Sequence, residues 1–343
     1  MEHPDEVFAQ MSKEEPNTNL KQAQDAENAA DFFSAAHYYK KALELARDSG
    51  DSQTVIFCKN KVVEMNQKSK EVFKELNVEQ EVPNEEINKV VYSILEGDLE
   101  IVLKKIGSHP FLFPKMQQVE ESAKKSVPIS YQIASLSAIS PGGHLVKGGS
   151  DGNYSWAMQM YGMQQGFINE FYLRRIFIGL ATKGFSEESL LIYLRSKGIF
   201  PENNLGVIAI GVSRYFVQDY VSALHILTPQ FENVFLFISE RLGIDIVALN
   251  RGKEVSTQLK TLSAEHLGSE TFQSKWGRDF CEQIKFVLFE PLGYMLRHKI
   301  AHGQITKEEC TPQMANLILY FYLVLAARIG TKEQQQKISK INL

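Results

Sequence analysis

The chain has 343 residues, of which 44% are hydrophobic and 23% are charged. This balance is ordinary for a soluble globular protein, and the length allows two or three packed units. The formal net charge of -4 and the pI near 6.1 argue against a protein that coats nucleic acid non-specifically, because such proteins carry a large basic surplus. A local basic site remains compatible with these values.

The cysteines and the apolar runs bound the cellular setting. Cys58, Cys281 and Cys310 lie far apart and form no CxxC pair, so we predict reduced core thiols, with neither a disulfide framework nor a cysteine zinc site. The first residues, MEHPDEVFAQMSKEEP, lack the basic and apolar regions of a signal peptide. The longest apolar run, residues 315–327, is shorter than the roughly 20 residues that a membrane span needs. We therefore expect a cytoplasmic protein without a membrane segment, in which this run is a helix buried on nearly all sides.

Residues 1–80 are predicted to form an N-terminal helical region. Between residues 19 and 76, apolar residues recur at three- and four-residue spacing, and the clearest helix ends at Gly50. This stretch resembles a single tetratricopeptide unit, although a generic helical hairpin explains the spacing equally well. The resemblance implies close packing by small and aromatic residues, at Ala30, Phe33, Ala36, Tyr39 and Ala42.

A charged segment with a proline, EQEVPNEE at residues 79–86, marks a boundary, and residues 81–160 form a predicted connecting region. Helical spacing resumes there until prolines interrupt it. Residues 140–153, SPGGHLVKGGSDGN, could be a phosphate-binding loop or a hairpin. A Walker loop needs a lysine before its serine or threonine, but Gly149 precedes Ser150. We therefore expect a small irregular or hairpin segment over residues 137–153.

From Trp156 onward the spacing is again helical, which makes the predicted fold all-α, with a C-terminal domain over residues 161–343. Thr228 and Pro229 have the pattern of a helix start, and Thr306 with Glu309 fits a capping box. The expected helices are Gln164–Thr182, Ser186–Lys197, Asn204–Gln218, Pro229–Leu242, Phe272–His302 and Lys307–Ile329.

The heptapeptide RHKIAHG, residues 297–303, concentrates positive and titratable side chains where Gly303 would end a helix. A structural interpretation is that cations stabilise a helix C-terminus, by about 0.3–1 kcal/mol. A metal site is a second interpretation, because His298 and His302 are four residues apart, but Lys299 between them is unfavourable beside a dication. A third is phosphodiester cleavage, in which histidine acts as base and arginine stabilises phosphate charge.

The third interpretation coincides with a family resemblance. Arg297, a polar residue at 298 and His302 resemble the Arg-polar-x3-His motif of the HEPN superfamily, the higher eukaryote and prokaryote nucleotide-binding domains. The surrounding sequence is similar to a HEPN-like family of unknown function, through PQFE at residues 229–232 and LRHKIAHG at residues 296–303. The resemblance covers residues 164–329, about half of the chain.

This resemblance implies a helical domain that pairs about a two-fold axis and cleaves RNA without a metal or another cofactor. Carried over by position, His302 would be the base or acid, Arg297 would hold the phosphate, and His298 would support them. Glu232 matches an acidic residue that approaches the motif, and Lys299 adds a second supporting side chain. Such proteins often serve as bacterial defence effectors or toxins. The chain departs from the family pattern at residues 235–237, FLF, where an arginine is usual.

Helix geometry complicates this site. Five residues of an ideal helix turn through roughly 500°, so Arg297 and His302 would point about 140° apart. Either the helix is interrupted between them, or a homodimer supplies one from each subunit. The alternative hypothesis is a non-catalytic interaction or nucleotide-binding protein whose N-terminal helices bind a protein partner. Whether the chain is an enzyme, and which RNA it would cleave, stays open at this point.

Overall fold

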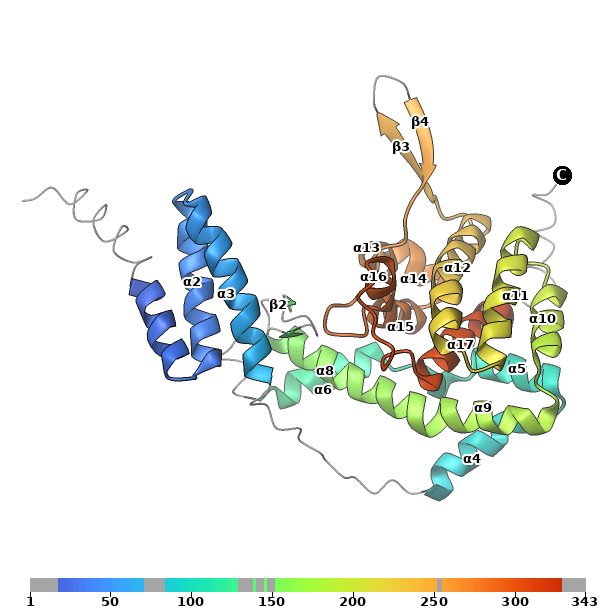
Figure 1. Cartoon of the computed structure of the whole chain (residues 1–343). Helices are drawn as coiled ribbons and strands as arrows, with labels where there is room; N and C mark the ends of the chain where they lie inside the picture. Colours follow the sequence, from blue (N-terminus) through green and yellow to red (C-terminus); the bar gives the residue numbers. More distant parts are fainter. Residues whose placement is uncertain are drawn as a thin grey trace, which may run out of the picture. The chain divides into compact units, whose positions relative to one another are not determined.

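The computed structural model describes residues 18–70, 84–128, 138–139, 145–146, 152–251 and 255–328. The chain divides into two compact units, a smaller one of Met1–Glu81 with Ala134–Ser150 and a larger one of Val82–Ile133 with Asp151–Leu343 (Figure 1). Helices make up almost all of what is described in both units, so the predicted all-α fold is confirmed.

The smaller unit is built from the helix at residues 18–28, α2 (Phe32–Asp48) and α3 (Ser52–Lys70). Glu27 ties the three helices together: it accepts a hydrogen bond from the Tyr39 hydroxyl at 2.7 Å and pairs with Lys61 Nζ at 2.7 Å. Small residues allow the helices to approach closely around an apolar core. That core consists of Ala23, Ala35, Ala36, Tyr39, Ala42, Cys58, Val62 and Met65.

Of the five residues expected to pack in this unit, Ala36, Tyr39 and Ala42 are buried, but the prediction was wrong for Ala30 and Phe33. Helix α2 begins only after Asp31, whose carboxylate accepts the Ser34 N–H at 3.1 Å. Ala30 therefore lies outside the helix, with a φ of 58°, and Phe33 on the first turn is 67% exposed.

The predicted hairpin near residues 137–153 is present as two short strands. β1 (Ala138–Ile139) and β2 (Leu145–Val146) pair antiparallel, with Ala138 opposite Val146. The rest of the glycine-rich segment, including Gly149 and Ser150, lies outside the described residues.

The larger unit carries the remaining helices and one further hairpin. Its first half contains α4 (Asn84–Leu95), α5 (Leu99–Ser108), a 3-10 turn η1 (Pro110–Leu112), α6 (Met116–Ser126), α8 (Gly152–Phe167), a π-helical segment η2 (Ile168–Leu173), α9 (Arg174–Leu180) and a 3-10 turn η3 (Ala181–Lys183). Its second half contains α10 (Glu187–Ser196), α11 (Glu202–Phe216), α12 (Tyr220–Arg241), β3 (Val247–Arg251), β4 (Val255–Leu259), α13 (Ala264–Gly268), α14 (Glu270–Trp276), α15 (Arg278–Leu288), α16 (Leu296–Ala301) and α17 (Pro312–Arg328).

Helix α17 forms the centre of this unit. Every residue from Ala315 to Ala326 is buried, as the apolar run predicted, and α5 and α12 pack against it. Its two internal tyrosines donate to backbone carbonyls, Tyr320 to Leu112 at 3.1 Å and Tyr322 to Leu227 at 2.8 Å. The hydroxyls of these buried rings are thereby satisfied, which makes their burial tolerable.

Several helix boundaries differ from the prediction. Helix α12 begins at Tyr220, so Pro229 lies inside it and Thr228 is not its cap. The expected helix over residues 272–302 is divided into α14, α15 and α16, and α17 starts at Pro312 instead of Lys307. Glu309 does accept the Thr306 N–H, at 2.9 Å, but the bond closes a turn ahead of the helix.

The β3–β4 hairpin was not predicted. Its strands pair antiparallel from Val247 opposite Leu259 to Arg251 opposite Val255, and the hairpin projects from the helical body of its unit (Figure 1). A two-stranded ribbon is marginally stable by itself in water.

Among the described residues, α12 alone is long and apolar enough to cross a membrane, and half of its most apolar window is buried within the unit. Core helices of globular proteins share this composition. The three cysteines are free and buried, as expected. Burial raises the pKa of the Cys281 thiol to about 12, which keeps it in the unreactive protonated form.

Candidate functional site at the α16 motif

The heptapeptide forms a short helix of its own, because the chain reverses between α15 and α16. Tyr294 N–H donates to the Phe286 carbonyl at 3.1 Å, and a β-carbon on Gly293 would lie 2.1 Å from the same oxygen, so only glycine fits there. Met295 then adopts the left-handed conformation, with a φ of 49°, before α16 begins at Leu296. Non-glycine residues rarely adopt this conformation, which marks the entry into the motif as strained.

The helix ends as the sequence predicted. Gly303 has a φ of 63°, its N–H donates to the Ile300 carbonyl at 3.3 Å, and Gln304 N–H donates to the Lys299 carbonyl at 2.7 Å. These two bonds make a Schellman cap. His302 is the C-cap residue, at φ -105° and ψ 7°, so its side chain leaves the backbone just outside the helix.

Arg297 is held by Glu232 of α12. Its Nε–H donates to Glu232 Oε2 at 3.3 Å, and Glu232 Oε1 accepts the Leu262 N–H at 3.1 Å. The Glu232 side chain is 13% exposed and that of Arg297 is 33% exposed. A guanidinium has five N–H donors, so this pair leaves both terminal nitrogens of Arg297 without a partner among the described residues and available to an anion.

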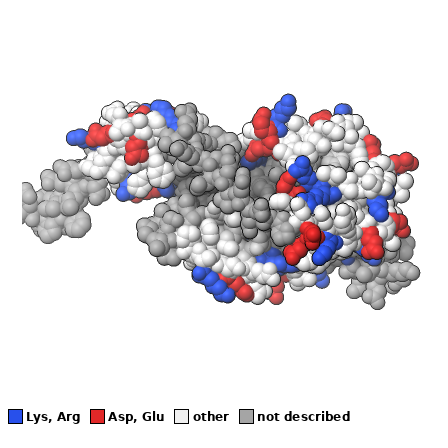
Figure 2. Space-filling view, turned by 90° about the horizontal axis from the view of Figure 1, so that it is seen from below, with Lys and Arg blue, Asp and Glu red and all other residues white. Residues whose placement is uncertain are grey.

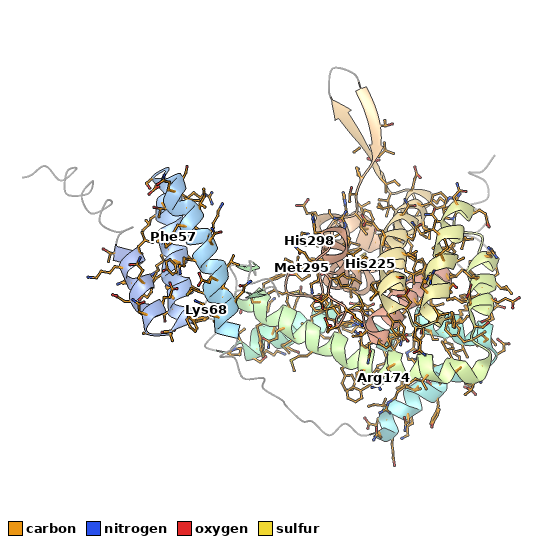
Figure 3. The ribbon with its side chains drawn as sticks, in the orientation of Figure 1. Phe57, Lys68, Arg174, His225, Met295 and His298 are labelled. Carbon is orange, nitrogen blue, oxygen red and sulfur yellow. The ribbon has the colours of Figure 1, made fainter. Side chains whose placement is uncertain are left out.

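The two histidines of the motif lie together. The His298 and His302 rings are 4.3 Å apart between centroids, and Figure 3 labels His298 on α16 and Met295 directly before this helix. His302 is exposed, whereas His298 is half-buried. Burial lowers the pKa of His298, and the positive charges of His302 and Arg297 lower it further. A proton on His298 is therefore disfavoured, which suits a neutral hydrogen-bonding partner.

Lys299 is directed elsewhere. Its Nζ pairs with Glu309, which also accepts the Thr306 N–H. Burial raises the pKa of Glu309, but the hydrogen bonds from Lys299 and Thr306 outweigh it, and the net effect is a lowered pKa. Glu309 was predicted only as part of a capping box, and its role as the lysine's partner was missed, although the spacing to Thr306 already indicated its position.

The structure thus pairs Arg297 with Glu232 and His298 with His302, while Arg297 and His302 share no hydrogen bond or ring contact. The first explanation offered for the angular mismatch, an interruption between the two, is wrong, since α16 is helical up to Ala301. Within one chain, the cation and the exposed imidazole belong to separate side-chain pairs.

A cavity of about 380 Å³ adjoins the Arg297–Glu232 pair. Glu232, Asn233 and Phe237 of α12 line this cavity. Lys260, the residue after β4, lines it as well. Lys260 is itself paired with Asp245, at 3.1 Å. Of these lining residues, Glu232 was predicted as a site residue and the others were not; Lys260 was missed because the β3–β4 hairpin before it was not predicted.

The surface displayed in Figure 2 carries charges of both signs. On the face displayed in Figure 2, Lys and Arg alternate with Asp and Glu, and the described atoms there form no continuous basic track. In the part of the chain that the structure describes, no three His, Cys, Asp or Glu side chains group as a metal site would require. The candidate chemistry therefore rests on Arg297, His298 and His302.

Comparison of the sequence with models of protein families and with curated proteins, and comparison of the fold with solved structures, gives no match.

Proposed function

We propose that this protein is a metal-independent endoribonuclease of the HEPN type that acts as a homodimer with a composite active site. The observation that carries the proposal is that one short helix, α16, carries Arg297 paired with Glu232 and ends at the exposed His302. Glu232 accepts the Nε–H of the guanidinium, which leaves the terminal N–H donors available to an anion. An arginine held in this way suits the charge that grows on a phosphate.

The reaction would be an intramolecular transesterification. His302 would accept the proton of a ribose 2′-hydroxyl as the 2′-oxygen forms a bond to phosphorus, and the bond to the 5′-oxygen would break. A protonated imidazole, the partner's His302, would give a proton to that leaving oxygen. The products are a 2′,3′-cyclic phosphate and a 5′-hydroxyl, and no metal enters the atom balance.

The geometry of one chain supports the proposed dimer. Because Arg297 and His302 make no contact within α16, a cleft between two copies would bring the arginine of one toward the histidine of the other. The resemblance to HEPN proteins, which pair in this way, supports the same arrangement. It also supports a role in defence or as a toxin in a bacterial cytoplasm.

The proposal is tested by incubating mixed cellular RNA with the purified protein in EDTA and analysing the fragment ends. We expect 2′,3′-cyclic phosphates from the wild type and none from His302→Ala. Arg297→Lys keeps the charge but loses the planar fork, so we expect it to be strongly impaired. Size-exclusion chromatography and circular dichroism establish that each variant keeps its fold and dimer. Equal cleavage by His302→Ala would contradict the proposal.

A second function, a non-catalytic interaction protein, is favoured by one observation in the smaller unit. Phe33, Ile56 and Phe57 are exposed by 67%, 61% and 43%, more than a packed helical unit requires. A photo-crosslinking residue at position 56 of the full chain tests it. Crosslinking to one defined protein, together with no RNA cleavage under any condition, would favour this function over the nuclease.

A further inference from the structure

A second cavity, of about 480 Å³, lies in the larger unit at residues that neither function uses. Its volume is in the range of small-molecule sites, which are mostly apolar with a few placed polar groups. One wall comes from η1 and the loop into α6, and the other from the end of α8 and the π-helical segment η2. The lining residues that bear on its chemistry are Phe111, Lys115, Gln118, Gln164, Phe167 and Tyr172.

The π-helical segment brings two of the aromatic rings to this cavity. The Arg174 N–H donates to the carbonyl of Asn169, five residues back, which widens the turn. In an α-helix, Phe167 and Tyr172 would point about 140° apart. Here their rings are 5.7 Å apart between centroids, at 70°, and both line the cavity. Such π turns are rare and are frequent at functional sites, so this one is a second indication of a ligand.

The uncharged polar side chains that line the cavity have no hydrogen-bond partner among the described residues. Gln118 and Gln164 are exposed, and their amides form no hydrogen bond with any described residue. The Tyr172 hydroxyl likewise has no partner in the described part of the chain. Each amide offers both a donor and an acceptor, which is the pattern that pairs with the edge of a nucleobase.

The charge of the cavity argues against an anionic ligand. Lys115 is its only charged lining residue among those described, and its Nζ already pairs with Asp279 at 2.8 Å. The local charge is therefore balanced, and a phosphate would have to compete with the Asp279 carboxylate. A flat, uncharged ligand with hydrogen-bonding edges fits these lining groups.

We propose that this cavity binds an uncharged nucleobase between the rings of Phe111 and Phe167 or Tyr172, with Gln118 and Gln164 on its edge. The base would come either from a free nucleoside or from an unstacked position of an RNA strand, since both present the same ring. Base stacking on aromatic side chains is tolerant of sequence, so the amides would supply the selectivity. The proposal does not rest on nuclease activity.

The test is saturable binding of adenosine, guanosine, cytidine and uridine to the full chain, measured by saturation-transfer NMR and calorimetry. Phe111 is 60% exposed, so Phe111→Ala should fold normally, and Tyr92→Ala on α4, a ring exposed by 69% outside the cavity, is the matched control. We expect Phe111→Ala to reduce the affinity for the best-bound nucleoside at least about fivefold, because one stacking ring is lost. Tyr92→Ala should leave this affinity unchanged. His302→Ala should also bind normally, which separates this result from any loss of cleavage.

Two further ligands identify the source of the base. A trinucleotide of the preferred base that binds more tightly than the nucleoside, and loses this gain in Phe111→Ala, identifies an RNA strand. Equal affinity identifies the free nucleoside. Absence of saturable binding by all four nucleosides, or equal binding by wild type and Phe111→Ala, would overturn the proposal. A 5′-monophosphate that binds tenfold more tightly than its nucleoside would overturn the charge argument.

Discussion

Arg297 and Glu232 are 65 residues apart in sequence and meet at 3.3 Å, which joins the short α16 to the middle of α12. Glu232 also accepts the N–H of the buried Leu262, so one carboxylate fixes both the guanidinium and the chain after β4. This double role makes Glu232 a structural residue as well as a candidate site residue.

Two substitutions at Glu232 separate these roles. Glu232→Ala leaves the Leu262 N–H without an acceptor, and we expect a loss of about 1–3 kcal/mol in the free energy of unfolding. Glu232→Gln keeps an acceptor oxygen and loses only the charge, so its cost should be below about 1 kcal/mol, as for a partly exposed ion pair. Urea unfolding measures both. If the two variants lose equal stability, the bond to Leu262 contributes nothing. Both should reduce RNA cleavage, because both free Arg297 to rotate.

The pair of histidines predicts a pH dependence. The pKa of His298 in the folded protein lies below its ordinary value of 6.5, so the unfolded chain binds this proton more tightly. The free energy of unfolding is therefore unaffected by His298 above pH 6.5. It decreases as the pH falls from 6.5 through the lowered pKa of His298. We expect unfolding midpoints of His298→Asn to vary less between about pH 7 and pH 5 than those of the wild type.

NMR titration checks the cause directly. Because the charge of His302 contributes to the lowered pKa of His298, His302→Ala should raise that pKa, though burial should keep it below the ordinary value. A His298 pKa unchanged in His302→Ala would show that the two imidazoles do not interact in solution.

Sequence reasoning succeeded where local chemistry decides the structure. The helix expected over Ser186–Lys197 is present as α10, and the Ser186 hydroxyl caps it by accepting the Ser189 N–H at 3.2 Å. Gly303 takes the left-handed conformation, because a helix end there needs a residue without a β-carbon. The burial of α17 followed from a run of apolar residues with no polar face.

Sequence reasoning failed where distant residues or ambiguous signals decide the structure. A glycine or proline within a helical pattern does not say whether the helix kinks, continues or ends. Gly277 ends α14, with a φ of 82°, yet Pro229 is accommodated inside α12. The β3–β4 hairpin was missed because its strands, VALNR and VSTQL, show no regular apolar alternation. The approach of Glu232 to Arg297 was implied only by the family resemblance, since periodicity carries no information about a pair 65 residues apart.

A buried hydrogen-bond network connects the π-helical segment to the start of the motif. Gln283 Nε2 donates to Gln165 Oε1 at 2.9 Å, Gln165 Nε2 donates to Asn169 Oδ1 at 2.8 Å, and Asn169 Nδ2 lies 3.4 Å from the Tyr294 hydroxyl. Gln165 is fully buried, so the loss of its acceptor should be costly. The last contact is long and contributes little.

Truncation of Asn169 and of Tyr294 should show that the bond to Gln165 contributes more stability than the contact with Tyr294. We expect Asn169→Ala to reduce the free energy of unfolding by about 1–3 kcal/mol, because the Gln165 amide would lose its partner in the core. Tyr294→Phe keeps the ring against Phe286 and should cost less than about 1 kcal/mol. Chemical denaturation of the two variants gives the comparison. A larger loss from Tyr294→Phe would mean that the network is anchored at the motif instead of at Gln165.

Two glycines in helices should respond to alanine in opposite directions. A β-carbon on Gly107 of α5 would lie 2.2 Å from the Leu323 carbonyl of α17, so Gly107→Ala must separate the two helices. Overpacking of this kind costs about 1–3 kcal/mol. Gly206 of α11 has no described atom within 4 Å of its β position, and Gly206→Ala should stabilise the protein by roughly 0.5–1 kcal/mol through helix propensity. The thermal unfolding midpoints of both variants test these two expectations. If Gly107→Ala unfolded at the wild-type temperature, the close approach of α5 to α17 could not be present in solution.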